Sequence, residues 1–190
     1  MHRLGFYLLH FNILVVCGVL AGAFGAQFLG QELPCPLCIL QRMAMLLCAL
    51  GPASIIATSR LREITIADFC AGYGLSILAA VLGASISTRQ ILLHIIPPDP
   101  GFGDAVLGLH LYTWALLIFV TVVVMSGLNL VFCETLLPTG LRFNRLSQFT
   151  LGLLGLMIIA NLTTTFALAG LHWLLPDNPE HYQLFQDLTS

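Results

Sequence analysis

Cys35 and Cys38 form a Cys-x-x-Cys pair in the run ELPCPLCILQR, which separates two apolar stretches. Such a pair can close into a small disulfide ring, and its surroundings tune both the reactivity of the thiols and the reduction potential. Pro34 and Pro36 lack a backbone N–H group and disfavour helix at the residues before them, so we expect the pair on a bent loop. This chemistry favours a redox role. The alternatives are a structural disulfide or half of a metal site, although a metal site normally needs more Cys or His ligands.

Arg42 lies four residues after Cys38, where the next helix is expected to begin. A cation there can stabilise a thiolate or an anionic cofactor, and the positive end of the helix dipole adds to the effect. Both act more strongly on Cys38 than on Cys35, which is nearer to the loop and solvent. We therefore expect Cys38 to be the stable thiolate and Cys35 to be the sulfur that a partner reaches. The alternative is a pair of ordinary, equally exposed loop thiols.

The composition indicates a membrane protein. Of the 190 residues, 58% are hydrophobic and 8% are charged, whereas a soluble domain carries roughly 25% charged residues. The mean hydropathy is +0.94. A net charge of -2 without a basic patch argues against a nucleic-acid partner. Four other cysteines lie within or at the end of apolar runs and are expected to pack as small apolar residues: Cys17, Cys48, Cys70 and Cys133.

The gaps between charged residues divide the chain into five apolar runs. A membrane-crossing helix needs roughly 17–25 such residues, and its backbone groups must be paired within the lipid. The sequence therefore predicts an all-α integral membrane protein, a helical bundle of five transmembrane helices in a single membrane domain over residues 1–190. The predicted spans are 7–29, 42–59, 66–87, 107–132 and 149–173, with outer loops at 30–41 and 88–106 and an outer C-terminal tail at 174–190.

The arginines determine the predicted orientation. With the N-terminus inside, the inner segments carry five arginines and the outer segments two, in agreement with the enrichment of positive charge on the cytoplasmic side. The inner five are Arg3, Arg60, Arg62, Arg142 and Arg145, and the outer two are Arg42 and Arg89. This orientation places the Cys pair and the C-terminus at the outer surface, which in a bacterium is the periplasm, where disulfides persist.

Further polar and aromatic residues are expected at the same outer end: Arg42, Arg89, His94, His110, Tyr112, Trp114, His172 and Trp173. Aromatic residues at this depth commonly anchor helices at the interface, whereas ionisable groups within a membrane segment mark function more often. A quinone, an apolar ring with two carbonyl oxygens, suits such a site because Arg and His can donate hydrogen bonds to the oxygens. We expect Arg42, Arg89 and His94 to gather near Cys38, with His110 as a further cofactor-binding candidate.

The run from the Cys pair through Ile39-Leu40-Gln41-Arg42, which opens the second span, resembles the DsbB family. The end of the third span, with Arg89-Gln90, His94 and Pro97-Pro98, fits the same family, and the similarity covers about residues 5–100. Four of the five predicted spans would then correspond to those of the family.

This resemblance implies a thiol:quinone oxidoreductase of the bacterial inner membrane that supports disulfide bond formation. It implies ubiquinone or menaquinone as the electron acceptor, and a periplasmic DsbA-like thiol oxidase or other thiol protein as the partner. By the same resemblance, Cys38 is the quinone-facing sulfur and Cys35 exchanges with the incoming thiol. Arg42 is then expected against the quinone, and His94 near its pocket.

The sequence departs from the family pattern in two places. The family carries a second Cys pair in a long second outer loop, but residues 97–106 contain no cysteine, and Cys133 is predicted at the inner side. A fifth span is added instead. Either Cys35 meets the partner directly, or a membrane partner supplies the missing pair, or the role has diverged.

A different class of function is a non-catalytic membrane subunit, or an assembly protein that binds haem, a metal or a quinone. Two histidines on facing membrane helices can hold a b-type haem, and His110 and His172 are the candidates. A transporter is disfavoured, because the spans hold few charges and no pair of broken, repeat-related helices stands out.

Overall fold

The computed structural model describes the chain apart from residues 1, 100, 141–142, 173–174, 176–178 and 189–190. The described residues form five long helices, α1 (His2–Phe28), α2 (Pro36–Thr58), α3 (Ile66–Leu93), α4 (Leu111–Val131) and α6 (Arg145–Ala169), and two short ones, α5 (Cys133–Leu136) and α7 (Gln183–Asp187). Each long helix is long and apolar enough to cross a membrane. No strand is present in the described part of the chain. The predicted all-α membrane bundle of five spans is thus confirmed.

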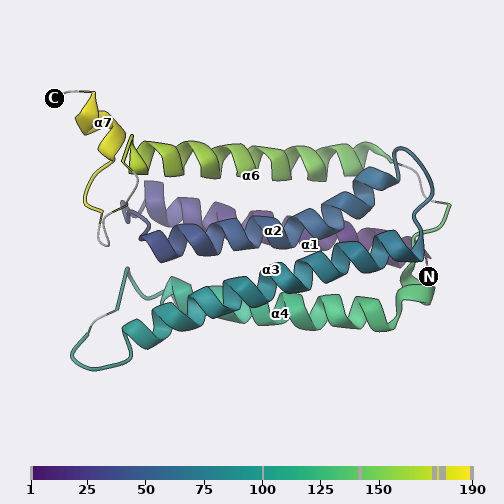
Figure 1. Cartoon of the computed structure of the whole chain (residues 1–190), viewed down its shortest axis with the longest axis horizontal. Coiled ribbons are helices and arrows are strands. Elements are labelled where there is room, and N and C mark those ends of the chain that lie inside the picture. The colour runs from purple at the N-terminus through teal and green to yellow at the C-terminus, as the bar shows by residue number, and fades with distance from the viewer. Residues whose placement is uncertain (1, 100, 141–142, 173–174, 176–178, 189–190) are drawn as a thin grey trace.

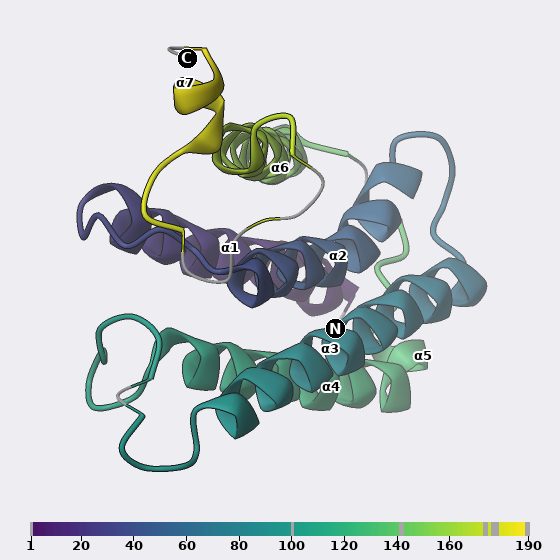
Figure 2. The ribbon, with the colours of Figure 1, turned by 60° about the vertical axis from the view of Figure 1, so that its left-hand side comes forward.

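The helices are arranged around α1 and α2. On one side α6 packs against both of these helices, while α3 and α4 lie on the other side (Figures 1 and 2). The central position of α2 explains why 72% of the apolar stretch that would cross the membrane is buried in this helix, against 17% in α6. The two ends of the chain lie at opposite ends of the bundle (Figure 1).

The start of α2 corrects the expectation that both cysteines lie on a bent loop. Cys35 is the N-cap residue with extended backbone, and Cys38 already belongs to the first turn of the helix. Pro36 occupies the first helical position, where a missing N–H group costs nothing because that group would have no partner within the helix. The helix therefore begins at Pro36, six residues before the predicted boundary at 42.

Small residues bring α2 and α3 close together in the middle of the bundle. A Cβ atom on Gly51 would lie 2.2 Å from the carbonyl oxygen of Gly72, so the two backbones meet where no larger residue fits. Beside this contact, the Ser76 hydroxyl donates to the carbonyl oxygen of Cys48 at 2.8 Å. This close contact fixes how α2 and α3 lie against each other, and so helps to determine which of their polar side chains meet at the end of the bundle that holds the Cys pair.

Candidate functional site

The sulfurs of Cys35 and Cys38 lie 2.7 Å apart, and no disulfide joins them. The backbone N–H of Cys38 donates to the sulfur of Cys35 at 3.2 Å. The first-turn amide of α2 therefore points at Cys35, because this residue and not Cys38 occupies the N-cap position. The pair is placed so that loss of two electrons and two protons can join the sulfurs after a small movement.

The two sulfurs differ in exposure, and this difference is opposite to the expected one. Cys35 is buried, with 5% of its surface exposed, while Cys38 is only partly buried. The expectation that Cys35 is nearer to solvent is therefore wrong, because Cys35 is enclosed at the turn into α2. The hydrogen bond with Cys38 and burial raise the pKa of the Cys35 thiol.

Two buried glutamines hold the pair from the side of α3. The side-chain amide of Gln90 donates to the sulfur of Cys35 at 3.3 Å and to that of Cys38 at 3.5 Å. Its oxygen accepts from the side chain of Gln41 at 2.8 Å. Sequence reasoning missed both residues as site candidates, although each is a polar residue next to an arginine within a mostly apolar segment.

Arg42 is held against α1. Its guanidinium donates to the side-chain oxygen of Gln27 at 2.5 Å and to the backbone oxygen of Ala23 at 2.9 Å, and it lies over the ring of Phe24 at 5.1 Å. Only 8% of Arg42 is exposed. Because a guanidinium carries five N–H donors in a fixed plane, these contacts orient it and leave other donors free for a ligand.

A cavity of about 440 Å³ opens beside Cys38 and Arg42. Its walls come from α1, α2, α4, the loop between α1 and α2, and the loop between α3 and α4. The residues that line it together with Cys38 and Arg42 are Val19, Gly22, Ala23, Ala26, Glu32, Leu33, Pro34, Gln41, Met45, Phe102, Gly103, Val106, Leu111, Tyr112, Trp114, Ala115 and Ile118. Apolar side chains dominate, and a few polar groups provide direction, which is typical of a site for a small, largely apolar ligand.

The loop between α3 and α4 closes over this cavity through contacts with the loop between α1 and α2 and with α4. The backbone N–H of Asp104 donates to the carboxylate of Glu32 at 3.0 Å, and the Trp114 indole donates to the backbone oxygen of Val106 at 2.9 Å. Gly101 has φ +83°, and a Cβ there would lie 2.6 Å from the imidazole of His110, so glycine is needed at this turn.

His94 and His110 flank Tyr112. Of these three residues, Tyr112 lines the cavity. The Tyr112 ring stacks on His94 with ring centroids 5.9 Å apart and on His110 at 5.2 Å. His94 is bonded to Asp99 at 2.9 Å, and His110 to the backbone oxygen of Gly103 at 3.1 Å. The Gly101 N–H and His94 lower the pKa of the Asp99 carboxyl. The two histidines thus support the wall of the cavity through Tyr112.

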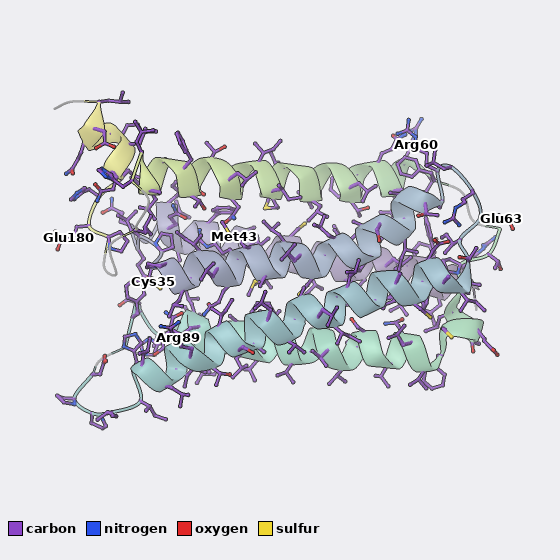
Figure 3. The ribbon with its side chains drawn as sticks, viewed as in Figure 1. Cys35, Met43, Arg60, Glu63, Arg89 and Glu180 are labelled. Carbon is purple, nitrogen blue, oxygen red and sulfur yellow. The ribbon has the colours of Figure 1, made fainter. Side chains whose placement is uncertain are left out.

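Arg89 does not join this group. It is exposed and lines a separate groove of about 690 Å³ between α3 and α4. Leu92 and Val120 line the same groove. Consecutive residues on a helix point about 100° apart, so the burial of Gln90 toward the cysteines turns Arg89 away from them. Figure 3 shows that Arg89 still lies at the same end of the bundle as Cys35.

The structure does not bring together the two histidines considered for haem. His110 precedes α4 and His172 follows α6, and these helices lie on opposite sides of α1 and α2 (Figures 1 and 2). His172 is bonded instead to Asp187 at 3.1 Å. Among the described residues, no three His, Cys, Asp or Glu side chains gather as metal ligands would. Trp173 and Arg142 lie outside the described residues.

Comparisons with known proteins match the half of the chain that holds the Cys pair. A profile of the family described as "Disulfide bond formation protein DsbB" matches residues 6–104. Disulfide bond formation protein B of Chromobacterium violaceum is 41% identical in an alignment of 93 residues, and the match covers 46% of this chain and 53% of that protein. Disulfide bond formation protein B 1 of Pseudomonas fluorescens strain Pf0-1 is 29% identical in an alignment of 145 residues, and the match covers 60% of this chain and 83% of that protein. The chain thus spans about half the length of the first of these relatives. No solved structure matches the chain.

Proposed function

The chain belongs to the DsbB family, and we propose that it is a thiol:quinone oxidoreductase that supports disulfide bond formation. In this proposal Cys35 and Cys38 are the catalytic residues, and electrons pass through them from the thiols of a partner protein to ubiquinone or menaquinone in the membrane. The observation that carries the proposal is that Cys38 and Arg42 line one largely apolar cavity.

The residues at the cavity suit a quinone. Arg42 and Gln41 bring N–H donors to the end of the cavity where Cys38 lies, and such donors can bond the carbonyl oxygens of the ring. The apolar walls suit the ring itself, and Tyr112 extends them with an aromatic face supported by His94 and His110. A quinone held there would accept the two electrons and two protons that the two thiols of the pair release as they become a disulfide.

The first half of the cycle is thiol–disulfide exchange. A thiolate of the partner attacks the sulfur of Cys35, the Cys35–Cys38 bond breaks, and Cys38 leaves as a thiolate. The second thiol of the partner then breaks the mixed disulfide, so that the partner leaves oxidised and this chain holds two thiols. Gln90 can donate to the departing Cys38 sulfur. Because Cys35 is buried, the proposal requires the turn before α2 to move when the partner docks.

The proposed location is the bacterial inner membrane, with the N-terminus in the cytoplasm and the C-terminus in the periplasm. Figure 3 shows Cys35, Arg89 and Glu180 at one end of the bundle and Arg60 and Glu63 at the other. The excess of arginines at the N-terminal end favours that end as the cytoplasmic one. The Cys pair then faces the compartment in which disulfides form.

The thiol partner must exchange electrons with this chain although the outer loops hold no second Cys pair. Residues 97–106 contain no cysteine, and Cys133 begins α5 at the end of the bundle that holds the N-terminus. We propose that the thiols of a DsbA-like partner meet Cys35 directly. A membrane partner that supplies the missing pair is the alternative within the same function.

The test is reduction of a short-chain quinone by a reduced thiol protein or by dithiothreitol, catalysed by the purified chain in detergent. Wild type and Cys70→Ser should be active, because Cys70 is exposed on α3 far along the helix from the pair. Cys38→Ser should be inactive, and Arg42→Lys should be impaired because lysine lacks the planar fork of donors. Absence of activity with every thiol donor, together with wild-type behaviour of Cys35→Ser in cells, would refute the proposal.

A further inference from the structure

The C-terminal segment, of which residues 170–172, 175 and 179–188 are described, lies at the end of the bundle that holds the Cys pair. It lies far beyond residues 6–104, which the family profile matches. Gly170, with φ +60°, follows the last residue of α6. The short helix α7 packs against α6, and Asp187 is bonded to His172. Figure 3 shows Glu180 at the same end as Cys35. This segment is therefore placed to act on the site from outside the region shared with the family.

One side chain of the segment reaches Arg42 through a single intermediate. The amide nitrogen of Gln27 donates to the hydroxyl oxygen of Tyr182 at 3.1 Å. The amide oxygen of the same Gln27 accepts from Arg42 at 2.5 Å. Gln27 is 3% exposed and Arg42 is 8% exposed, so water does not readily replace either contact.

Arg42 decides which end of the Gln27 amide faces it, because a guanidinium carries N–H donors and no acceptor. An amide carries a donor group and an acceptor oxygen at positions that a half-turn of the side chain exchanges. With its oxygen on the guanidinium, the amide donates from its nitrogen to Tyr182, and this second contact holds the Gln27 side chain in place. After a half-turn, N–H groups would face N–H groups, and the buried guanidinium would lose its acceptor.

We propose that Tyr182 is a positioning residue for Arg42, and that the C-terminal segment is thereby part of the quinone site. The inference rests on the proposed function. Tyr182 acts through Gln27, because it is not among the residues that line the cavity. Its loss leaves Arg42 in place but less firmly oriented, so the affinity for the quinone falls while exchange at Cys35 continues.

The test compares Tyr182→Phe with Tyr7→Phe, the same chemical change at an exposed position near the N-terminus. We expect Tyr182→Phe to raise the KM for a short-chain quinone roughly three- to tenfold, the range for one hydrogen bond. The rate at which dithiothreitol reduces the Cys35–Cys38 disulfide should not change. Tyr7→Phe should leave both quantities at the wild-type value.

A second pair of variants, built on Gln27→Glu, separates the orientation of Arg42 from the packing of the Tyr182 ring. In Gln27→Glu the carboxylate forms an ion pair with the Arg42 guanidinium, which holds both side chains in place without Tyr182. Adding Tyr182→Phe to Gln27→Glu should therefore change the KM by less than about twofold. An unchanged KM in Tyr182→Phe alone, or an equal rise in both backgrounds, would overturn the inference. A wild-type chain without any quinone reduction would instead refute the proposed function, and the inference with it.

Discussion

The side-chain amide of Gln90 lies 3.3 Å from the sulfur of Cys35, although 55 residues separate the two in the sequence. The same nitrogen lies 3.5 Å from the sulfur of Cys38, so one buried side chain of α3 contacts both members of the pair at the start of α2. The packing of α3 against α2 is thus linked directly to the chemistry of the thiols.

This contact predicts that Gln90→Leu slows thiol exchange. The substitution removes the donor to both sulfurs, and one hydrogen bond contributes about 0.5–1.5 kcal/mol. The rate at which dithiothreitol reduces the Cys35–Cys38 disulfide should fall roughly tenfold, as followed by trapping and mass analysis of the thiols. Gln148→Leu, at an exposed position on α6, is the matched control. Equal rates in the two variants would show that Gln90 only fills space.

The shape of the cavity predicts that Gly22→Leu weakens quinone binding. A Cβ added at Gly22 meets no atom within 4 Å, so the larger side chain can enter the cavity without disturbing the fold. The KM for a short-chain quinone should rise about tenfold, which corresponds to ~1.4 kcal/mol. Gly152→Leu makes the same change in open space on α6 and should leave the KM unchanged. A wild-type KM for Gly22→Leu would place the quinone elsewhere.

The raised pKa of Cys35 predicts an order of labelling in the reduced protein. Between about pH 6 and about pH 9 Cys35 should stay a protonated thiol, so iodoacetamide should modify Cys38 first throughout this range. Peptide mass analysis after short pulses measures this order. Earlier modification of Cys35 would contradict the arrangement.

The same shift has a consequence for stability. Above the usual thiol pKa of about 8.5, the unfolded chain releases the Cys35 proton while the folded chain retains it. The stability of the reduced protein should therefore fall as the pH rises through this range. Cys35→Ser should remove that part of the pH dependence.

The orientation predicts the outcome of reporter fusions. Fusions at Leu61 and Asn144 should report the cytoplasm. Leu61 follows the end of α2 and Asn144 precedes the start of α6, and both lie at the end of the bundle that holds the N-terminus. A fusion at the C-terminus should report the periplasm. A cytoplasmic C-terminus would show that one of the five long helices does not cross the membrane.

The sequence was sufficient to predict the five helices and to single out the Cys pair and Arg42 as candidates, and the structure places Cys38 and Arg42 on one cavity. Long charge-free runs leave few alternatives to membrane helices. A Cys-x-x-Cys pair followed by Arg42 can be recognised from the sequence alone. Which way a side chain points was harder to predict. Arg89 and Gln90 are neighbours in the sequence, but only the packing of α3 on α2 decides that Gln90 meets the sulfurs.

The polar network around the site was not predicted for a related reason. Gln27, Gln41 and Gln90 are uncharged, so they do not interrupt an apolar run and leave no mark in a count of charges. Their partners are also distant in the sequence, as with Gln27 and Tyr182. The boundary of α2 was missed because proline was taken to oppose helix, whereas at the first helical position it favours one.

A single-turnover experiment tests the central claim most directly. The purified chain, with its Cys pair reduced and excess thiol removed, is mixed without oxygen with a short-chain quinone, and quinol and disulfide are counted together. We predict one quinol formed for each Cys35–Cys38 disulfide, and none in Cys38→Ser. Quinol formation at an undiminished rate in Cys38→Ser, or disulfide formation without quinol, would contradict the account.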